Sequence, residues 1–108
     1  MGITKTEGFK KTTTIMADRL KALGHPARLA IIEFLAESPS CICGDIVNEL
    51  PLAQPTISRH LSELKKVGLI KGTIEGKNIC YCIDEVIWQE VKEHIDSLSR
   101  VLVNKKCC

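Results

Sequence analysis

Six cysteines lie in three close pairs along the 108-residue chain, and thiols are well suited to soft-metal binding and to redox chemistry. The pairs are Cys41/Cys43, Cys80/Cys82 and Cys107/Cys108. Thiolates select thiophilic ions such as As(III), Sb(III), Cd(II) and Pb(II), whereas neighbouring thiols can also bridge on oxidation. In a reducing compartment such cysteines are more often ligands or sensors than a disulfide framework.

The second chemically informative feature is the segment 54–64, which has the residue types of a DNA-reading helix. If Ile57, Leu61 and Leu64 face a core, a polar set must point outward. That predicted DNA-facing set is Gln54, Thr56, Ser58, Arg59 and Ser62. Gln pairs with adenine and Arg with guanine, so Gln54 and Arg59 are the expected base readers. His60 lies near the apolar stripe and is expected to pack.

An amphipathic helix alone is as typical of an ordinary solvated surface helix as of a DNA-reading helix. The segment that follows decides between these two interpretations. Residues 69–74 and 79–83 are predicted strands joined by a turn at 75–78. Lys71 and Lys77 on this hairpin are expected to hold phosphates. The net charge of +2 is too small to indicate nucleic acid, but positive charge is concentrated between residues 54 and 78.

The predicted elements that position these residues form a mainly helical chain with one small hairpin. Helices are expected at about 9–23, 26–37, 41–50, 54–67 and 85–102, with Pro26 in a first turn and Asp84 as a cap. The expected fold is a winged helix-turn-helix of about five helices plus a two-stranded wing. Residues 1–8 are predicted to be flexible, 9–103 to form the domain, and 104–108 to be a mobile tail.

Three sequence runs in this order resemble the ArsR/SmtB family of metalloregulators. Residues 23–32 (LGHPARLAII) are similar to its helix-junction signature, residues 54–64 (QPTISRHLSEL) to its recognition helix, and 67–70 with 76–81 to its wing. The resemblance covers about residues 9–103. It implies a homodimer through the first and last helices. It also implies binding to an inverted-repeat operator in double-stranded DNA, and repression relieved by an inducer.

Cys41-Ile42-Cys43 is similar to the arsenic- and cadmium-type site that this family has at the start of its third helix. A helix start would favour the thiolate forms. Residues two apart on a helix point about 200° apart, so one ion on both sulfurs would unwind the first turn. The family's third thiol position holds Ile46 here. Cys107 and Cys108 are therefore the expected further ligands of As(III) or Sb(III), either together with Cys41 and Cys43 or as a separate site with another thiol.

Other functions remain open at this stage. A Cd(II)/Pb(II) sensor is less favoured because residues 1–40 contain no cysteine, and a zinc site on the last helix would be incomplete, with Asp84, His94 and only Ser97. Cys80 and Cys82 are expected to be ordinary wing residues facing away from the core. A redox or persulfide sensor of the same fold is the main alternative.

An enzyme is not expected, because no nucleophile–base constellation is present. The chain has no apolar stretch of membrane-spanning length and no secretion signal, so a cytoplasmic protein without a membrane partner is expected.

Overall fold

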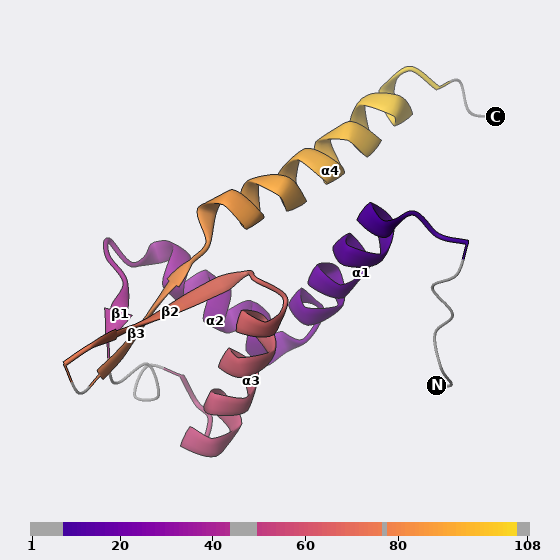
Figure 1. Cartoon of the computed structure of the whole chain (residues 1–108). Coiled ribbons are helices and arrows are strands. Elements are labelled where there is room, and N and C mark those ends of the chain that lie inside the picture. Colours follow the sequence, from indigo (N-terminus) through magenta and orange to yellow (C-terminus); the bar gives the residue numbers. More distant parts are fainter. Residues whose placement is uncertain (1–7, 44–49, 77, 106–108) are drawn as a thin grey trace.

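A three-helix core carries a small sheet, and a long terminal helix begins beside the base of this sheet and projects away from it (Figure 1). The computed structural model describes residues 8–43, 50–76 and 78–105. The elements are α1 (Lys11–Leu23), α2 (Pro26–Glu37), β1 (Ile42–Cys43), α3 (Gln54–Lys66), β2 (Ile70–Glu75), β3 (Asn78–Ile83) and α4 (Glu85–Val103). Figure 1 shows the β2–β3 hairpin and the far end of α4 projecting in opposite directions.

The helices begin and end at residues whose local chemistry favours a boundary. His25 precedes α2, and its Nδ1 accepts a hydrogen bond from the Ala27 N–H, while Pro26 occupies the first turn, where its missing N–H costs nothing. Gly68 follows α3 with φ +84°, a backbone region that favours glycine. Asp84 accepts from the N–H groups of Val86 and Ile87 and so caps α4.

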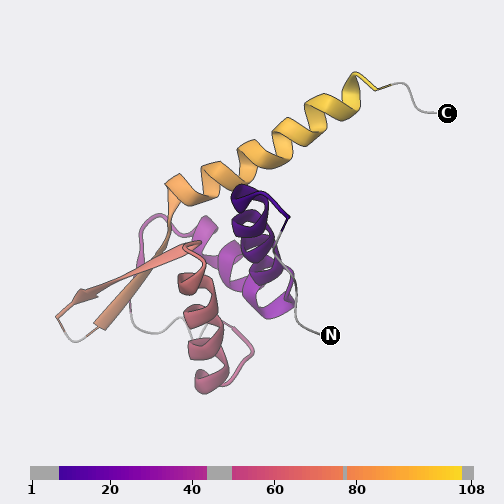
Figure 2. The same ribbon diagram turned by 45° about the vertical axis from the view of Figure 1, so that its right-hand side comes forward.

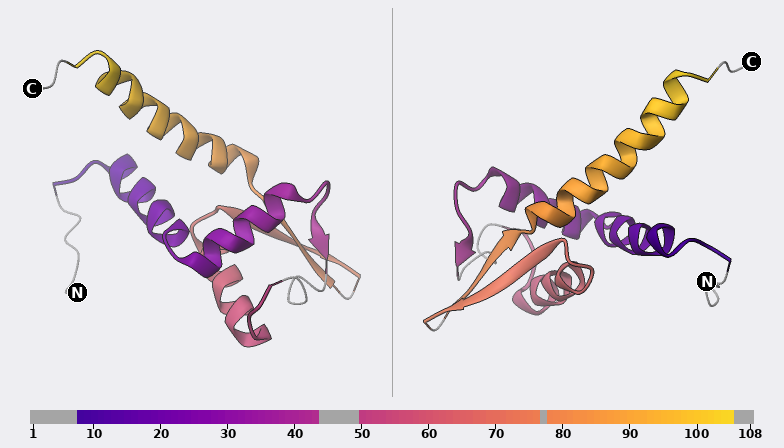
Figure 3. Two further views of the ribbon diagram at one scale, coloured as in Figure 1. Left: turned by 180° about the vertical axis from the view of Figure 1, so that it is seen from behind. Right: turned by 45° about the horizontal axis from the view of Figure 1, so that its top comes forward.

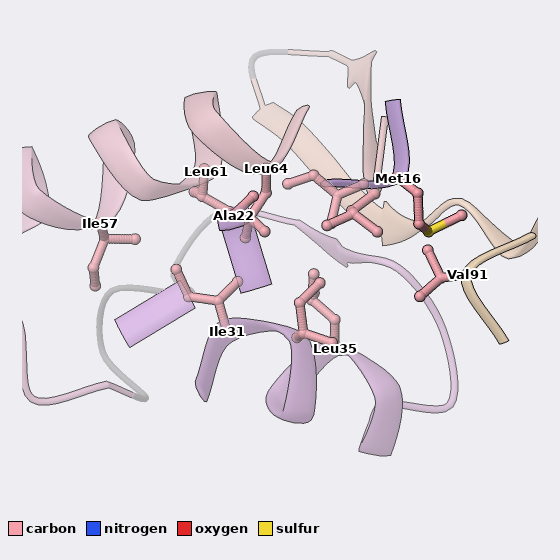
Figure 4. Close-up of a cluster of buried hydrophobic side chains, with 11 residues drawn as sticks. Met16, Ala22, Ile31, Leu35, Ile57, Leu61, Leu64 and Val91 are labelled. Atoms are coloured by element: carbon pink, nitrogen blue, oxygen red, sulfur yellow. The ribbon is translucent and has the colours of Figure 1, made fainter. Parts of the chain in front are cut away.

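The core lies where α1, α2 and α3 meet the base of α4 (Figure 4). The predicted stripe of α3 is confirmed, because Ile57, Leu61 and Leu64 are all buried. Helix α2 contributes the following buried side chains: Ile31, Ile32 and Leu35. His60 is also buried, as its place beside the stripe predicted. Burial of this stripe fixes the opposite face of α3 toward solvent.

The sheet differs from the predicted two-stranded wing, because a third strand joins it. Its order is β1-β3-β2, and all pairs are antiparallel. Ile42 pairs with Tyr81 and Cys43 with Cys80, so the chain after α2 is attached to β3. The prediction of a helix beginning at Cys41 is therefore wrong for residues 41–43, and residues 44–49 lie outside the described part. The described ranges contain four helices rather than about five, with a three-stranded sheet.

Helices α1 and α4 carry apolar side chains that this single chain does not bury. Figures 2 and 3 show α4 extending well beyond the rest of the molecule. Its base is tied to α1 by an ion pair of 2.8 Å between Arg19 and Glu90. The exposed large apolar residues on or beside these two helices include Phe9, Ile15, Leu20, Ile95, Leu98, Val101 and Leu102. Among the described residues, no helix combines the length and apolarity needed to cross a membrane.

Replacement of the α4 cap tests this account of the helix start. We expect Asp84→Ala to lower the free energy of unfolding by about 1 kcal/mol, because two backbone N–H groups lose their acceptor. Asp84→Asn keeps an acceptor oxygen and should lose much less. Urea unfolding at one fixed protein concentration measures both values, and equal losses in the two variants would contradict the capping role.

Candidate functional site

The outward face of α3 presents the predicted DNA-facing side chains to solvent. Gln54, Ser58, Arg59 and Ser62 are exposed, and Thr56 is half-buried. The helix opens with Gln54 and Pro55 in its first turn, and its polar N-terminal half is the part of a recognition helix that contacts base edges. The face is therefore available to a DNA groove.

The β2–β3 hairpin, which we call the wing, lies beside the C-terminal half of α3. A Cβ placed on Gly72 would be 3.5 Å from Lys65 Nζ and 3.3 Å from the Tyr81 ring, so the end of the Lys65 side chain lies over the wing at this glycine. Lys71 is exposed on β2 and pairs in register with Cys82. Lys77, the other predicted phosphate contact, lies outside the described residues. The arrangement places Lys71 near the wing's base rather than at its tip.

A pair of histidine rings connects the start of α2 with α3. The ring centroids of His25 and His60 are 4.5 Å apart. Burial lowers the pKa of His60, electrostatic interactions with His25, Arg28 and Arg59 lower it further, and Glu63 opposes them. The Nδ1 atom of His60 is buried and has no hydrogen-bond partner among the residues that the structure describes. The fold therefore favours neutral His60 at this helix junction.

The structure brings together two cysteines that are 41 positions apart in the sequence. Cys41, just before β1, and Cys82, on β3, form a disulfide with a Cα–Cα distance of 4.7 Å. Cys41 is exposed and Cys82 is half-buried. This pair was not predicted, because each cysteine was assigned to a different role from its local pattern alone. It joins the segment that leads from α2 toward α3 directly to the wing.

An open pocket of about 610 Å³ lies beside this disulfide. Its wall comes from the end of α2, the wing and the first turn of α4. The lining includes both sulfur-bearing residues, together with Leu35, Lys71, Tyr81, Ile83, Glu85 and Trp88. The pocket therefore combines a disulfide with aromatic and aliphatic side chains.

The remaining predicted thiol positions have different outcomes. Cys80 was expected to face away from the core, but it is 1% exposed and is disulfide-bonded, whereas Ile79 is 46% exposed. The expected exposure is therefore wrong for Cys80, which pairs with Cys43 of β1, whereas Ile79 lies on the part of β3 beyond this pairing. Cys107 and Cys108 lie outside the described residues.

The predicted helical setting of Cys41 and Cys43 also needs correction. Residues 42 and 43 are a strand, so neither the helix N-terminus nor the 200° offset between the two side chains applies to them. Asp84, considered for a zinc site, uses its carboxylate as the α4 cap. Within the described ranges, no group of three or more His, Cys, Asp or Glu residues could hold a metal ion.

Comparison with known proteins identifies the class of regulator. Residues 25–71 match the family described as "Bacterial regulatory protein, arsR family". An HTH-type transcriptional regulator of Methanocaldococcus jannaschii is 44% identical over 84 residues, which are 76% of this chain and 92% of that protein. The chain belongs to the ArsR family. It is therefore a winged helix-turn-helix transcriptional repressor of the ArsR/SmtB type and not an enzyme.

Two further relatives bear on the thiols of this ArsR-family chain. The arsenical resistance operon repressor of Escherichia coli K12 is 32% identical over 100 residues, with 81% of this chain and 84% of that protein covered. The structure titled "Reduced HlyU" from Vibrio cholerae is 28% identical with a TM-score of 0.63 and covers 84% of this chain and 92% of that one.

The burial of His60 predicts a pH dependence of stability. Its folded-state pKa is below the unfolded value of 6.5, so the unfolded chain binds the proton more readily. The free energy of unfolding should therefore fall as pH drops through 6.5 toward the folded-state pKa. Urea unfolding between pH 8 and 5 measures this slope. His60→Gln should flatten it, and His94→Gln on α4 is the matched control. An unchanged slope in His60→Gln would contradict the prediction.

Proposed function

We propose that the protein binds an inverted-repeat operator as a homodimer and leaves it when As(III) or Sb(III) binds cysteine thiolates, so that a metalloid-resistance operon is expressed. The observation that carries the proposal is the contact between Cys41 and Cys82. A ligand held at Cys41 would act on the connection between the wing and the segment that leads to α3. The similarity to an arsenical resistance operon repressor supports the choice of inducer.

The proposed DNA contacts follow from the exposed face of α3. Gln54 and Arg59 read bases in the major groove, and Thr56, Ser58 and Ser62 support them with shorter polar contacts. Lys71 and Lys77 contact phosphates, which sets orientation but carries no sequence information. Two copies place two such helices on the two halves of an inverted repeat.

The dimer interface proposed is the apolar surface of α1 and α4. Side chains such as Ile15, Leu98 and Leu102 are 40%, 53% and 63% exposed, a costly arrangement in water for a chain of this size. A second copy related by a twofold axis would cover this self-complementary surface. The dimer also doubles the number of phosphate contacts.

Inorganic As(III) prefers a pyramid of three thiolates, so Cys41 requires two further sulfurs. Cys43 and one of the two tail residues, Cys107 or Cys108, are the proposed additional ligands. Cysteine thiolates select a soft ion over Mg²⁺ or Ca²⁺, which prefer oxygen ligands. Metalloid binding lowers the affinity of the repressor for its operator only if the ion binds the DNA-free conformation more tightly than the DNA-bound one.

A second candidate function is a thiol-oxidation sensor, and the Cys41–Cys82 disulfide is the observation that favours it. In this case oxidation of the dithiol would change operator affinity, with two electrons passing to the oxidant and no metal required. The likeness to a protein whose structure is titled as a reduced form is consistent with this alternative.

The first test concerns base reading. Arg59→Ala should weaken operator binding by about 10- to 100-fold, corresponding to about 1–3 kcal/mol, and should reduce the discrimination between operator and mutated duplexes. Lys92→Ala removes one positive charge from exposed α4 and is the charge-matched control. Fluorescence anisotropy at one salt concentration measures both. If both variants weaken binding equally and keep the sequence preference, Arg59 is not a base reader.

The second test concerns the inducer. In excess reductant, As(III) should release wild-type protein from a labelled inverted-repeat duplex selected by the protein itself, and Cys41→Ser should abolish the release. Cys41→Ser should retain operator affinity in the absence of As(III), which shows that the variant folds.

Zn(II) and hydrogen peroxide are run beside As(III) in the same assay. Release by peroxide without reductant, and none by As(III) with reductant, would replace the metalloid function by the oxidation sensor. Retained release in Cys41→Ser would exclude Cys41 as a ligand.

A further inference from the structure

Two isoleucines near the tip of the wing form an exposed cross-strand pair. Ile74 of β2 pairs in register with Ile79 of β3, and the two residues are 81% and 46% exposed. Isoleucine is favoured in strands, and cross-strand pairs stabilise a hairpin. That role still leaves most of Ile74 in water, an unfavourable position that contact with a partner would relieve.

The isoleucine pair lies on the face of the wing that meets the end of α3. Residues two apart on a strand share a face, so Gly72 and Ile74 lie on the same face of β2. A Cβ built on Gly72 would be 3.4 Å from Ile79 Cγ2 and 3.5 Å from Lys65 Nζ. The Lys65 side chain therefore reaches the face that carries both isoleucines.

Lys65 also continues the polar stripe of α3 that is proposed to face DNA. Ser58, Ser62 and Lys65 are spaced by four and then three residues, which places them on one side of the helix, and all three are exposed. The proposed DNA-facing surface of α3 is thus continuous, through Lys65, with the isoleucine pair on the wing. This continuity indicates that the partner of the pair is the same DNA.

The length of the wing matches the spacing of the two grooves of DNA. β2 has six residues and therefore spans about 20 Å. One turn of B-DNA is about 35 Å long, so a minor groove follows about 17 Å from the major groove that α3 would enter. Lys65 would lie near the phosphates between the two grooves, and the wing tip would reach the minor groove.

The proposed dimer does not cover the isoleucine pair. Its surface lies on α1 and α4, and the wing tip and the far end of α4 point in opposite directions (Figure 1). With α1 and α4 at the twofold axis, each wing extends away from the centre of the operator. The groove that the pair would meet is therefore on the outer flank of each half-site.

We propose that Ile74 and Ile79 form an apolar wedge that enters the minor groove on the outer flank of each operator half-site and partly unstacks one base step. Isoleucine is among the apolar residues that unstack base steps in this way, and pyrimidine–purine steps such as TA deform most easily. The wedge would select DNA by its deformability and not by base edges. The inference rests on the proposed operator binding and adds a second mode of sequence selection to it.

A fluorescent base at the flanking step tests the wedge. The adenine analogue 2-aminopurine is quenched by stacking, so its fluorescence rises when a step opens. It is placed in the operator duplex about five base pairs, or half a turn, outward from the centre of a half-site. Binding of the reduced full-length protein should raise this fluorescence.

The double variant Ile74→Thr/Ile79→Thr should leave the fluorescence at the level of free DNA. Threonine is β-branched, so it keeps the preference for a strand while removing apolar surface. Ile74→Thr alone, at the more exposed position, should lose part of the rise. Circular dichroism like that of the wild type shows that the variants fold.

The base sequence of the flank gives a second readout. The wild type should bind a duplex with a flanking TA step about tenfold more tightly than one with a stiff A-tract there, a difference typical of one altered base pair. The double variant should lose this preference and keep the base discrimination that Arg59 provides. Val86→Thr, which changes a 71% exposed apolar residue on α4, is the matched control and should behave as the wild type.

Two results would overturn the wedge and leave the proposed function in place. The first is operator binding and release by As(III) without any rise in 2-aminopurine fluorescence. The second is a double variant that keeps the rise and the flank preference. A smaller DNA-free assembly of the double variant in sedimentation would assign the pair to contact between copies, and would also overturn the wedge.

The proposed function can fail separately from the wedge. A fluorescence rise that the double variant abolishes, without release of the operator by As(III), would keep the wedge and reject the inducer. Absence of any sequence-selective DNA binding by the wild type would reject the proposed operator and the wedge together.

Discussion

The pairing of β3 with strands on both of its sides is the constraint on which the rest of the structure depends. β2 alone would give a two-stranded hairpin, which is marginal in water without further packing. β1 adds Ile42 opposite Tyr81 and Cys43 opposite Cys80, so the chain that leaves α2 is held against the wing. The Cys41–Cys82 contact then follows from this register. Without β1, the thiol pair and the pocket beside it would not exist.

The same pairing explains how a small ligand could influence a DNA-reading surface. α3 is held on one side by the α2 core, through Ile31 and Leu64, and on the other by close packing of Lys65 over Gly72 of the wing. The His25–His60 contact links the start of α2 to the middle of α3. A change at the wing base therefore has a short physical route to α3. Proximity alone does not produce coupling of this kind. The ligand must also bind two conformations of the repressor with different affinities.

Local chemistry made much of the fold predictable. Pro26, Gly68 and Asp84 determine where helices begin or end through their own backbone and side-chain properties, and the spacing of the α3 stripe identifies its buried face. The position of the wing after α3 followed from strand alternation and a turn with Gly76. These features need only a few neighbouring residues, which is why the sequence is sufficient for them.

The thiol site depended on information that local patterns do not contain. Cys-Ile-Cys is too short for its periodicity to distinguish a helix start from a strand. The pairing of β1 with β3 joins residues about 38 positions apart, and only the complete fold determines that register. The strand alternation around Cys80 was correctly recognised, but it could not reveal that a third strand pairs with this stretch of β3. Prediction therefore identified Cys41 as a candidate and missed Cys82.

We propose that As(III) and operator DNA stabilise two different conformations of one repressor, so each should weaken the binding of the other by the same factor. Isothermal titration calorimetry would measure As(III) binding by the reduced protein alone and by its saturated operator complex. The affinity for As(III) should be lower in the DNA complex by the same factor by which As(III) weakens operator binding. Equal As(III) affinity with and without DNA would contradict it, because a ligand indifferent to DNA cannot release the repressor.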